Sequence, residues 1–233
     1  MDNNSTTRVD EEVFEAMKPW FLEKYGNASS KDHSFGWEAD AAVEYSRKLI
    51  GNLINADSSG IIFTSGATES INLAHWGIAE AYSNKRKRII SSAIEHSVVI
   101  ESLQALEKKG FEVIYLSVNK EGRLDIEELK GLIDDNTLLV SIMTANNEIG
   151  IINDIESIGN ICKEKGVFFH TDATQAIGKI PFDIHKMNAD LVSFSGHKFY
   201  APKGIGALYI NRSKNFGIAK KTQLSRHRFI MRK

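Results

Sequence analysis

The sequence predicts an α/β domain with a mostly parallel, seven-stranded sheet and helices on both faces. Seven short apolar runs alternate along the chain with amphipathic stretches of helical period, and this alternation is typical of parallel sheets. Several runs are apolar almost throughout, for example residues 138–143, as expected of strands covered on both faces. With 42% hydrophobic and 25% charged residues among 233, the chain can bury a core without disulfides.

The expected elements follow one another without an internal repeat or a low-complexity linker. Two amphipathic segments come first and are predicted to be helices, near Glu11–Lys24 and Phe35–Asn55. The apolar runs are predicted to form strands at Gly60–Phe63, Arg88–Ser92, Glu112–Leu116, Leu138–Met143, Val167–His170, Leu191–Phe194 and Ala207–Ile210. Four helices are expected between them, near Glu69–Ser83, Ser97–Lys109, Ile126–Leu132 and Ile155–Lys165.

The residues that follow the strands are rich in chemically active side chains. Ligands bind outside the carboxyl ends of the strands in open α/β sheets, so we expect these segments to line one crevice. The segments are Thr64–Glu69, Glu95–His96, Asn146–Glu148, Thr171–Gln175 and Ser195–Lys198.

The segment after the first strand has the features of an anion site. Free N–H groups at a helix start bind anions, and the small residues Gly66 and Ala67 allow close approach, with Ser65 and Thr68 as further donors. A simple helix N-cap explains the same residues equally well. No Gly-Lys-Ser/Thr follows, so this is not a P-loop.

Asp172 and Lys198 together indicate a pyridoxal phosphate (PLP) site. A carboxylate after a buried strand needs a positive or donating partner, and the protonated pyridine nitrogen of PLP is one. A lysine at the crevice end of a strand is partly desolvated, which makes its amine a nucleophile for an aldehyde. Taken singly, Asp172 is as well explained by an N-cap or by a metal site with His170, and most lysines lie at the surface.

The other reactive residue types support this interpretation or do not contribute to it. A ring at His96 suits stacking on a flat cofactor or proton transfer, although a polar residue near a helix start explains it too. The seven histidines show no HExxH spacing, so we expect no metal site. Cys162, the single cysteine, lies on a predicted helix away from the crevice, where a cysteine usually acts as a small hydrophobe.

Together these segments resemble the class V aminotransferase family, and within it the cysteine desulfurases that supply iron–sulfur cluster assembly and tRNA thiolation. The resemblance rests on five segments and covers the chain from about Asp2 to Ile210. The segments are Phe63–Ser70, Glu95–His96, Asn146–Gly150, His170–Gln175 and Ser193–Lys198. It implies the large domain of a fold type I PLP-dependent transferase.

The resemblance also implies a role for each site residue. Lys198 would carry PLP covalently, and Asp172 would pair with the pyridine nitrogen. His96 would stack on the ring and move protons, and Gln175 and Asn147 would hold the side of the ring that bears the oxygen. The phosphate would be bound by Ala67, Thr68, Ser195 and His197.

Two departures from the family pattern affect the expected activity. Relatives continue into a smaller domain that carries a mobile catalytic cysteine, and Cys162 does not match that position. Residues 211–233 lack the family's Arg-x-Gly-Thr motif and hold four Lys and four Arg with no acidic residue, which leaves 21 basic and 30 acidic residues in 1–210. We therefore expect a large domain at 1–210, a divergent basic tail at 211–233, and a C-terminal truncation that removes the small domain.

The resulting hypothesis is a cysteine desulfurase that converts L-cysteine to L-alanine and bound sulfur for a scaffold protein, with impaired turnover. The resemblance implies a homodimer. A non-catalytic PLP-binding remnant, or a subunit that needs a complementary chain, is the alternative, as is a selenocysteine lyase or another class V enzyme. The net charge of −1 gives no case for nucleic-acid or membrane binding. One cysteine and no signal-like start make a cytoplasmic location the expectation.

Overall fold

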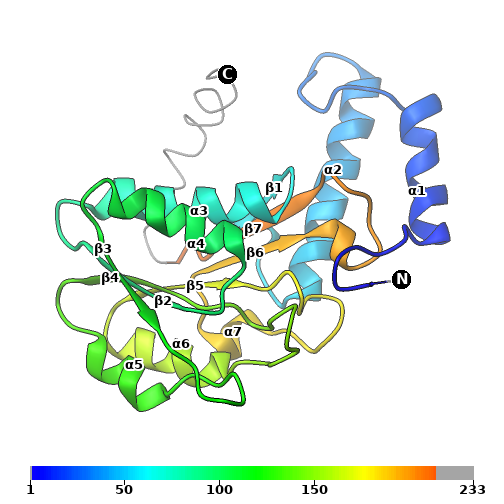
Figure 1. Cartoon of the computed structure of the whole chain (residues 1–233). Helices are drawn as coiled ribbons and strands as arrows, with labels where there is room; N and C mark the ends of the chain where they lie inside the picture. The colour runs from blue at the N-terminus through cyan, green and yellow to red at the C-terminus, as the bar shows by residue number, and fades with distance from the viewer. Residues whose placement is uncertain (1, 214–233) are drawn as a thin grey trace.

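The computed structural model describes residues 2–213 and consists of one twisted sheet covered by helices on both sides, with a pair of helices at one edge (Figure 1). The predicted tail at 211–233 lies outside the described residues from position 214 onward. No described helix is long and apolar enough to cross a membrane.

The sheet has seven strands in the order β1-β7-β6-β5-β4-β2-β3. Neighbours from β6 to β3 pair in parallel, whereas β7 pairs antiparallel with both β1 and β6. The mostly parallel, seven-stranded sheet predicted from the sequence is thereby confirmed. The strands are β1 (Ile61–Thr64), β2 (Arg88–Ser92), β3 (Glu112–Leu116), β4 (Thr137–Ser141), β5 (Phe168–Asp172), β6 (Leu191–Ser195) and β7 (Gly206–Ile210).

The two faces of the sheet are covered by different helices (Figure 1). One face carries α3 (Ala67–Tyr82) and α4 (Ser97–Glu107). The other carries α5 (Ile126–Leu132), α6 (Ile155–Glu164) and the short α7 (Ile184–Met187). The predicted coverage of both faces is confirmed, although α7 was not expected, because one turn of helix is too short to show a period.

Alternation along the strands divides the apolar residues between two cores. Ile89 of β2 and Leu139 of β4 pack under α3 and α4. Their neighbours Ile90 and Val140 point to the other face and pack against α6. Side chains alternate between faces in a strand, so two adjacent apolar residues are both buried only where both faces are covered.

Several predicted boundaries were wrong by one or two residues. The predicted fourth strand, Leu138–Met143, ends at Ser141, although its backbone goes on bonding to β5 beyond that point. The fifth strand was predicted to end at His170 and runs on through Asp172, because Thr171 and Asp172 pair with β6. The backbone of Asp172 is therefore held by the sheet itself.

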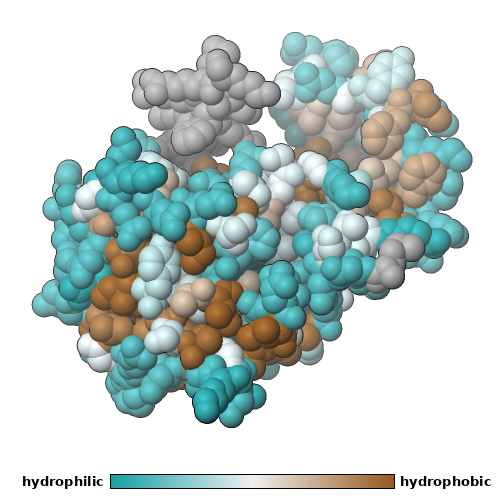
Figure 2. All heavy atoms as spheres, viewed as in Figure 1, coloured by the Kyte–Doolittle hydropathy of each residue, from teal (hydrophilic) through white to brown (hydrophobic). Residues whose placement is uncertain are grey.

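The helices α1 (Glu11–Leu22) and α2 (Ser34–Leu53) lie beside the β1 edge (Figure 1). In α1 no residue is buried, and in α2 the buried residues are Gly36, Ala39 and Gly51. Apolar side chains consequently reach the surface of this pair and its connection, as Figure 2 shows. They are Phe14, Phe21, Leu22, Tyr25, Phe35, Trp37, Val43, Tyr45, Leu49 and Leu53.

Candidate active site

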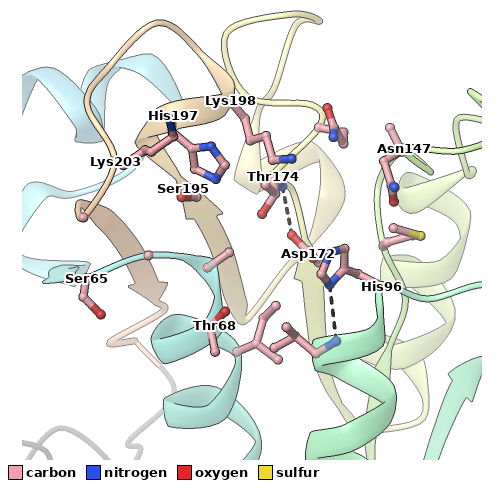
Figure 3. Close-up of a pocket in the computed structure, with 18 residues that line it drawn as sticks. Ser65, Thr68, His96, Asn147, Asp172, Thr174, Ser195, His197, Lys198 and Lys203 are labelled. Carbon is pink, nitrogen blue, oxygen red and sulfur yellow. Dashed lines mark hydrogen bonds between the residues drawn. The ribbon is translucent and has the colours of Figure 1, made fainter. Parts of the chain in front are cut away.

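A cavity of about 500 Å³ lies at the carboxyl ends of the central strands (Figure 3). All of the site residues predicted from the sequence line it, which brings together segments that lie far apart in the chain. They are Ala67, Thr68, His96, Asn147, Asp172, Gln175, Ser195, His197 and Lys198. A sheet whose strand ends gather polar loops at one edge provides this arrangement.

One wall of the cavity is the start of α3. Gly66 occupies the N-cap position and offers no side chain to accept from the first turn, so an anion in the cavity can take that place. The hydroxyl of Ser65 donates to Glu69 at 2.8 Å, which commits one of the donors that the sequence suggested. A Cβ on Gly206 would lie 2.6 Å from the Cα of Gly66, so glycine at position 206 lets the loop sit against β7.

Asp172 presents its carboxyl to the cavity from the end of β5 (Figure 3). The side chain is 5% exposed, and its Oδ1 accepts the N–H of Thr174 at 2.9 Å. Burial raises the pKa of Asp172, while the hydrogen bond from Thr174 and the charges of His96 and Lys198 act in the opposite direction. A buried acid in this position calls for a positive or donating group in the cavity.

Lys198 enters the cavity from the 3₁₀ turn Gly196–Lys198 that follows β6. Its amine donates to the carbonyl oxygens of Asn4 at 2.6 Å and Ser5 at 2.8 Å. Burial and the nearby Lys179 lower the pKa of Lys198, and Asp2 and Asp172 oppose that shift. A lysine with a lowered pKa has a larger fraction of the neutral amine that attacks carbonyl carbon.

The N-terminal segment holds the turn that carries Lys198. The Thr7 N–H donates to the His197 carbonyl at 2.9 Å, and the Thr7 hydroxyl accepts the Tyr200 N–H at 2.8 Å. The Thr6 hydroxyl lies 3.1 Å from Nδ1 of His197. Burial lowers the pKa of His197, with the charges of Lys198 and Lys203 acting in the same direction.

His96, Asn147 and Gln175 complete the predicted set from three further loops. His96 is the N-cap of α4, with Nδ1 accepting the Val98 N–H at 3.3 Å (Figure 3). The Asn147 amide donates to Glu148 at 2.8 Å. The Gln175 amide donates to the Asn4 carbonyl at 2.8 Å and accepts from Lys179 at 2.6 Å, so Gln175 also contacts the N-terminal segment.

The cavity has lining residues that sequence reasoning did not assign. Thr174 has a buried hydroxyl without a hydrogen-bond partner among the described residues. Its place between Asp172 and Gln175 was the signal that could have identified it. Lys203 also lines the cavity and brings a second positive charge near Ser195 and His197 (Figure 3). Its position in the turn before β7 gave no local sign of this.

Beneath the cavity runs a buried chain of neutral polar side chains. His75 of α3 contacts Ser102 of α4 at 3.1 Å and Ser141 of β4 at 3.0 Å. Ser141 contacts His170 of β5 at 2.8 Å, and His170 contacts Ser193 of β6 at 2.9 Å. Burial lowers the pKa of His75 to about 3 and that of His170 well below its usual range. His170 is thus engaged in the core and does not form a metal site with Asp172.

Cys162 lies in the core on α6, on the opposite face of the sheet from α3, and is 1% exposed. It does not line the cavity. Among residues 2–213 no cluster of three or more His, Cys, Asp or Glu side chains is arranged to hold a metal ion.

The lining suits PLP on structural grounds. The uncapped start of α3 and the hydroxyls of Thr68 and Ser195 suit a phosphate, and the buried Asp172 suits a protonated ring nitrogen. The amine of Lys198 reaches the same cavity (Figure 3). The cavity volume of about 500 Å³ is in the range of cofactor sites.

Comparison with known proteins agrees with this arrangement. The sequence profile of the class V aminotransferases matches residues 1–223. Cysteine desulfurase IscS from Rickettsia massiliae (strain Mtu5) is 53% identical over 212 residues, which is 91% of this chain and 52% of that protein. Cysteine desulfurase IscS from Ehrlichia chaffeensis (strain ATCC CRL-10679 / Arkansas) is 56% identical over the same shares. The chain spans about half the length of these curated relatives.

Solved structures show the same likeness. A NifS-like protein superposes with a TM-score of 0.88 at 45% identity, covering 91% of this chain and 58% of that one. SspA in complex with cysteine also gives a TM-score of 0.88, at 40% identity, and the match covers 92% of this chain and 61% of SspA.

Proposed function

This chain belongs to the class V aminotransferase family, and we propose that it is the cofactor-binding part of a cysteine desulfurase with L-cysteine as substrate. Cysteine desulfurases and class V aminotransferases depend on PLP. The observation that carries the proposal is the meeting of the Lys198 amine and the buried Asp172 carboxyl in one cavity. The identity of 53% to cysteine desulfurase IscS supports the choice of cysteine over other amino acids.

The proposed roles follow from the place of each side chain. Lys198 would hold PLP covalently, and Asp172 would keep a proton on the ring nitrogen. Thr68, Ser195 and His197 would bind the phosphate together with the first turn of α3 at Ala67. His96 would lie over the ring, while Asn147 and Gln175 would contact its oxygen-bearing side.

The chemistry needs proton transfers that these residues can carry out. When bound, PLP withdraws electrons from the α-carbon of an amino-acid substrate. Lys198, with its lowered pKa, is suited to take and return a proton at Nζ beside that carbon. His96 has Nε2 available for a second transfer, because Nδ1 accepts the Val98 N–H. Asp172 would balance the positive ring and not transfer protons itself.

Sulfur transfer needs one more group. Conversion of L-cysteine to L-alanine passes the sulfur atom to a thiolate as a persulfide. Cys162 is buried on the far face of the sheet, so we propose that it does not receive the sulfur and that the 233-residue chain alone turns over poorly. The burial of Cys162 also favours a second candidate function, a PLP-binding subunit that works with a complementary chain.

We further propose a homodimer, a sulfur-acceptor scaffold protein as partner, and a cytoplasmic location, where thiols stay reduced. The apolar residues exposed on α1 and α2 support an association surface. Sedimentation of the purified chain would give its mass in solution, and a monomer over the micromolar range would exclude the homodimer.

The proposed function is tested by incubating the PLP-loaded chain with L-cysteine and measuring alanine and sulfide. For the chain alone, we expect alanine and sulfide release near the level of the Lys198→Ala control. Release should increase when a chain or segment that supplies an accessible cysteine is added. Fast turnover by the chain alone that survives Cys162→Ala would contradict the proposed need for an accessible thiolate. If alanine were formed from another amino acid and not from L-cysteine, the proposed substrate would be wrong.

A further inference from the structure

A buried carboxyl outside the predicted site, that of Glu95, joins two of the loops that line the cavity. Glu95 follows β2 and directly precedes His96. Glu95 is 8% exposed, and its Oε1 accepts the N–H of Met143 at 2.8 Å. Met143 lies beyond the end of β4 and lines the cavity.

The hydrogen bond replaces a missing strand contact. Beyond β4, the N–H groups of Ile142 and Thr144 donate to carbonyls of β5, at His170 and Asp172. The N–H of Met143 points to the other side, toward β2, which has already ended at Ser92. Glu95 supplies the acceptor that the next residue of β2 would have supplied, and a buried N–H without an acceptor is costly.

A second contact joins the same two loops, because the Asn146 amide donates to the carbonyl of Ile94 at 2.7 Å. Within the loop after β4, the Asn153 amide donates to the carbonyl of Met143 at 2.7 Å. The loop that carries His96 is therefore held against the loop that carries Asn147 by two side chains, of which only Glu95 is ionisable.

We infer that Glu95 is a positioning residue: its carboxyl, held on the Met143 N–H, sets the loop of His96 against the end of β4 and so sets the ring of His96 over the cavity. The inference rests on the proposed function for the role of His96. It concerns how His96 is held and does not place Glu95 in contact with the cofactor.

The surroundings of Glu95 disfavour a negative charge on its carboxyl. Its Oε2 is buried and makes no hydrogen bond to the described residues, a setting that disfavours a negative charge. Burial raises the pKa of Glu95 well above its usual value, and the negative charge of Asp172 on β5 adds to the shift, against the hydrogen bond from Met143. The charge of His96, on the same loop as Glu95, acts on Asp172 and lowers the pKa of that carboxyl.

The test compares Glu95→Gln, Glu95→Ala and the control Glu101→Gln, which removes an exposed carboxylate from the helix that His96 begins. Without cofactor, amide exchange is measured by mass spectrometry over residues 94–98 and 143–147. We expect faster exchange in Glu95→Ala and wild-type exchange in Glu95→Gln, whose amide oxygen still accepts from Met143. With PLP, we expect Glu95→Ala to bind about tenfold more weakly, the effect of one lost buried hydrogen bond, and Glu95→Gln to bind within about twofold of wild type.

Two readouts separate positioning from general destabilisation. The induced circular dichroism of bound PLP, per molecule bound, reports how the ring is held, and it should change in Glu95→Ala and not in the other variants. The folded pKa of Glu95 lies above the unfolded value of 4.5, so its contribution to stability is lost as pH rises. Relative to wild type, the unfolding free energy of apo Glu95→Gln should therefore increase from pH 5 to pH 8. The Glu101→Gln variant should show no such trend.

Wild-type exchange and dichroism in Glu95→Ala would overturn the inference, and so would a Glu95→Gln variant that behaves like Glu95→Ala or loses stability relative to wild type as pH rises. If Glu95→Ala does not fold, the amide exchange of Glu95→Gln and the pH dependence of its unfolding free energy still test the inference. Loss of PLP binding by wild type would instead contradict the proposed function, because the exchange experiments need no cofactor.

Discussion

The amine of Lys198 donates a hydrogen bond of 2.6 Å to the carbonyl oxygen of Asn4, although 194 positions separate the two residues in the chain. Ser5, Thr6 and Thr7 add contacts to Lys198 and His197 on the same turn. The N-terminal segment is therefore part of the site. It holds the turn after β6 from outside the sheet.

The contact of Thr7 predicts that a change far from the cavity weakens cofactor binding. Tyr200 has a φ of +66°, in the left-handed region that costs a non-glycine residue about 1 kcal/mol, and the Thr7 hydroxyl accepts its N–H. Thr7→Val should lower the unfolding free energy by about 1 kcal/mol, because a partly buried N–H loses its acceptor, and weaken PLP binding severalfold. Urea unfolding and PLP titration measure both. The control Ser5→Ala keeps the carbonyl that Lys198 uses and should leave unfolding free energy and PLP affinity unchanged. If Thr7→Val also left them unchanged, the contact between Thr7 and Tyr200 would not be needed.

Asp172 predicts opposite effects on stability and binding. Its folded pKa is raised by burial above the unfolded value of 3.8, so its contribution to stability is lost as pH rises through the folded pKa. Asp172→Asn should therefore raise the melting temperature of the apo chain at pH 8 and weaken PLP binding by about tenfold or more, since a charge-assisted hydrogen bond is lost. Asp135→Asn is the exposed control. A lower apo melting temperature with unchanged PLP binding would show that Asp172 is structural.

The pair His75 and His170 predicts a loss of stability in acid. Both have folded pKa values below the unfolded value of 6.5, so their contribution is present above pH 6.5 and is lost as pH falls. Each histidine should contribute a slope of about 1.4 kcal/mol per pH unit below that point. Unfolding measured from pH 8 to pH 4 should show a smaller slope in His75→Gln and in His170→Gln, and an unchanged slope in the exposed His185→Gln. Equal slopes in all four proteins would mean that the buried pair is protonated in the fold.

The sequence was sufficient to predict the sheet and the polar segments at the carboxyl ends of its strands, because both depend on local pattern. The predicted bounds of β2 and β3 match the structure. The polar segments after the strands could be assigned to one crevice from the rule for parallel sheets alone. The end of β5 could not, since whether Asp172 continues the strand depends on its pairing with Ser193 of β6.

Long-range side-chain contacts were beyond sequence reasoning. Nothing near Asn4 or Thr7 shows that they meet Lys198 and Tyr200, and nothing near Glu95 shows that it bonds to Met143. Such partners depend on how loops pack after the sheet has formed. The polar chain through His75 and His170 is of the same kind, because it joins five elements that are brought together only by the fold.

The central claim is that Lys198 carries PLP, and covalent mapping tests it most directly. The 233-residue chain is titrated with PLP, reduced with borohydride, digested and analysed by mass spectrometry for the lysine that bears the pyridoxyl group. We predict a visible absorption band that saturates at one PLP per chain, with the label on Lys198, and loss of both in Lys198→Ala. A band that survives Lys198→Ala, or a label on Lys179 or Lys203 in the wild-type chain, would contradict the account.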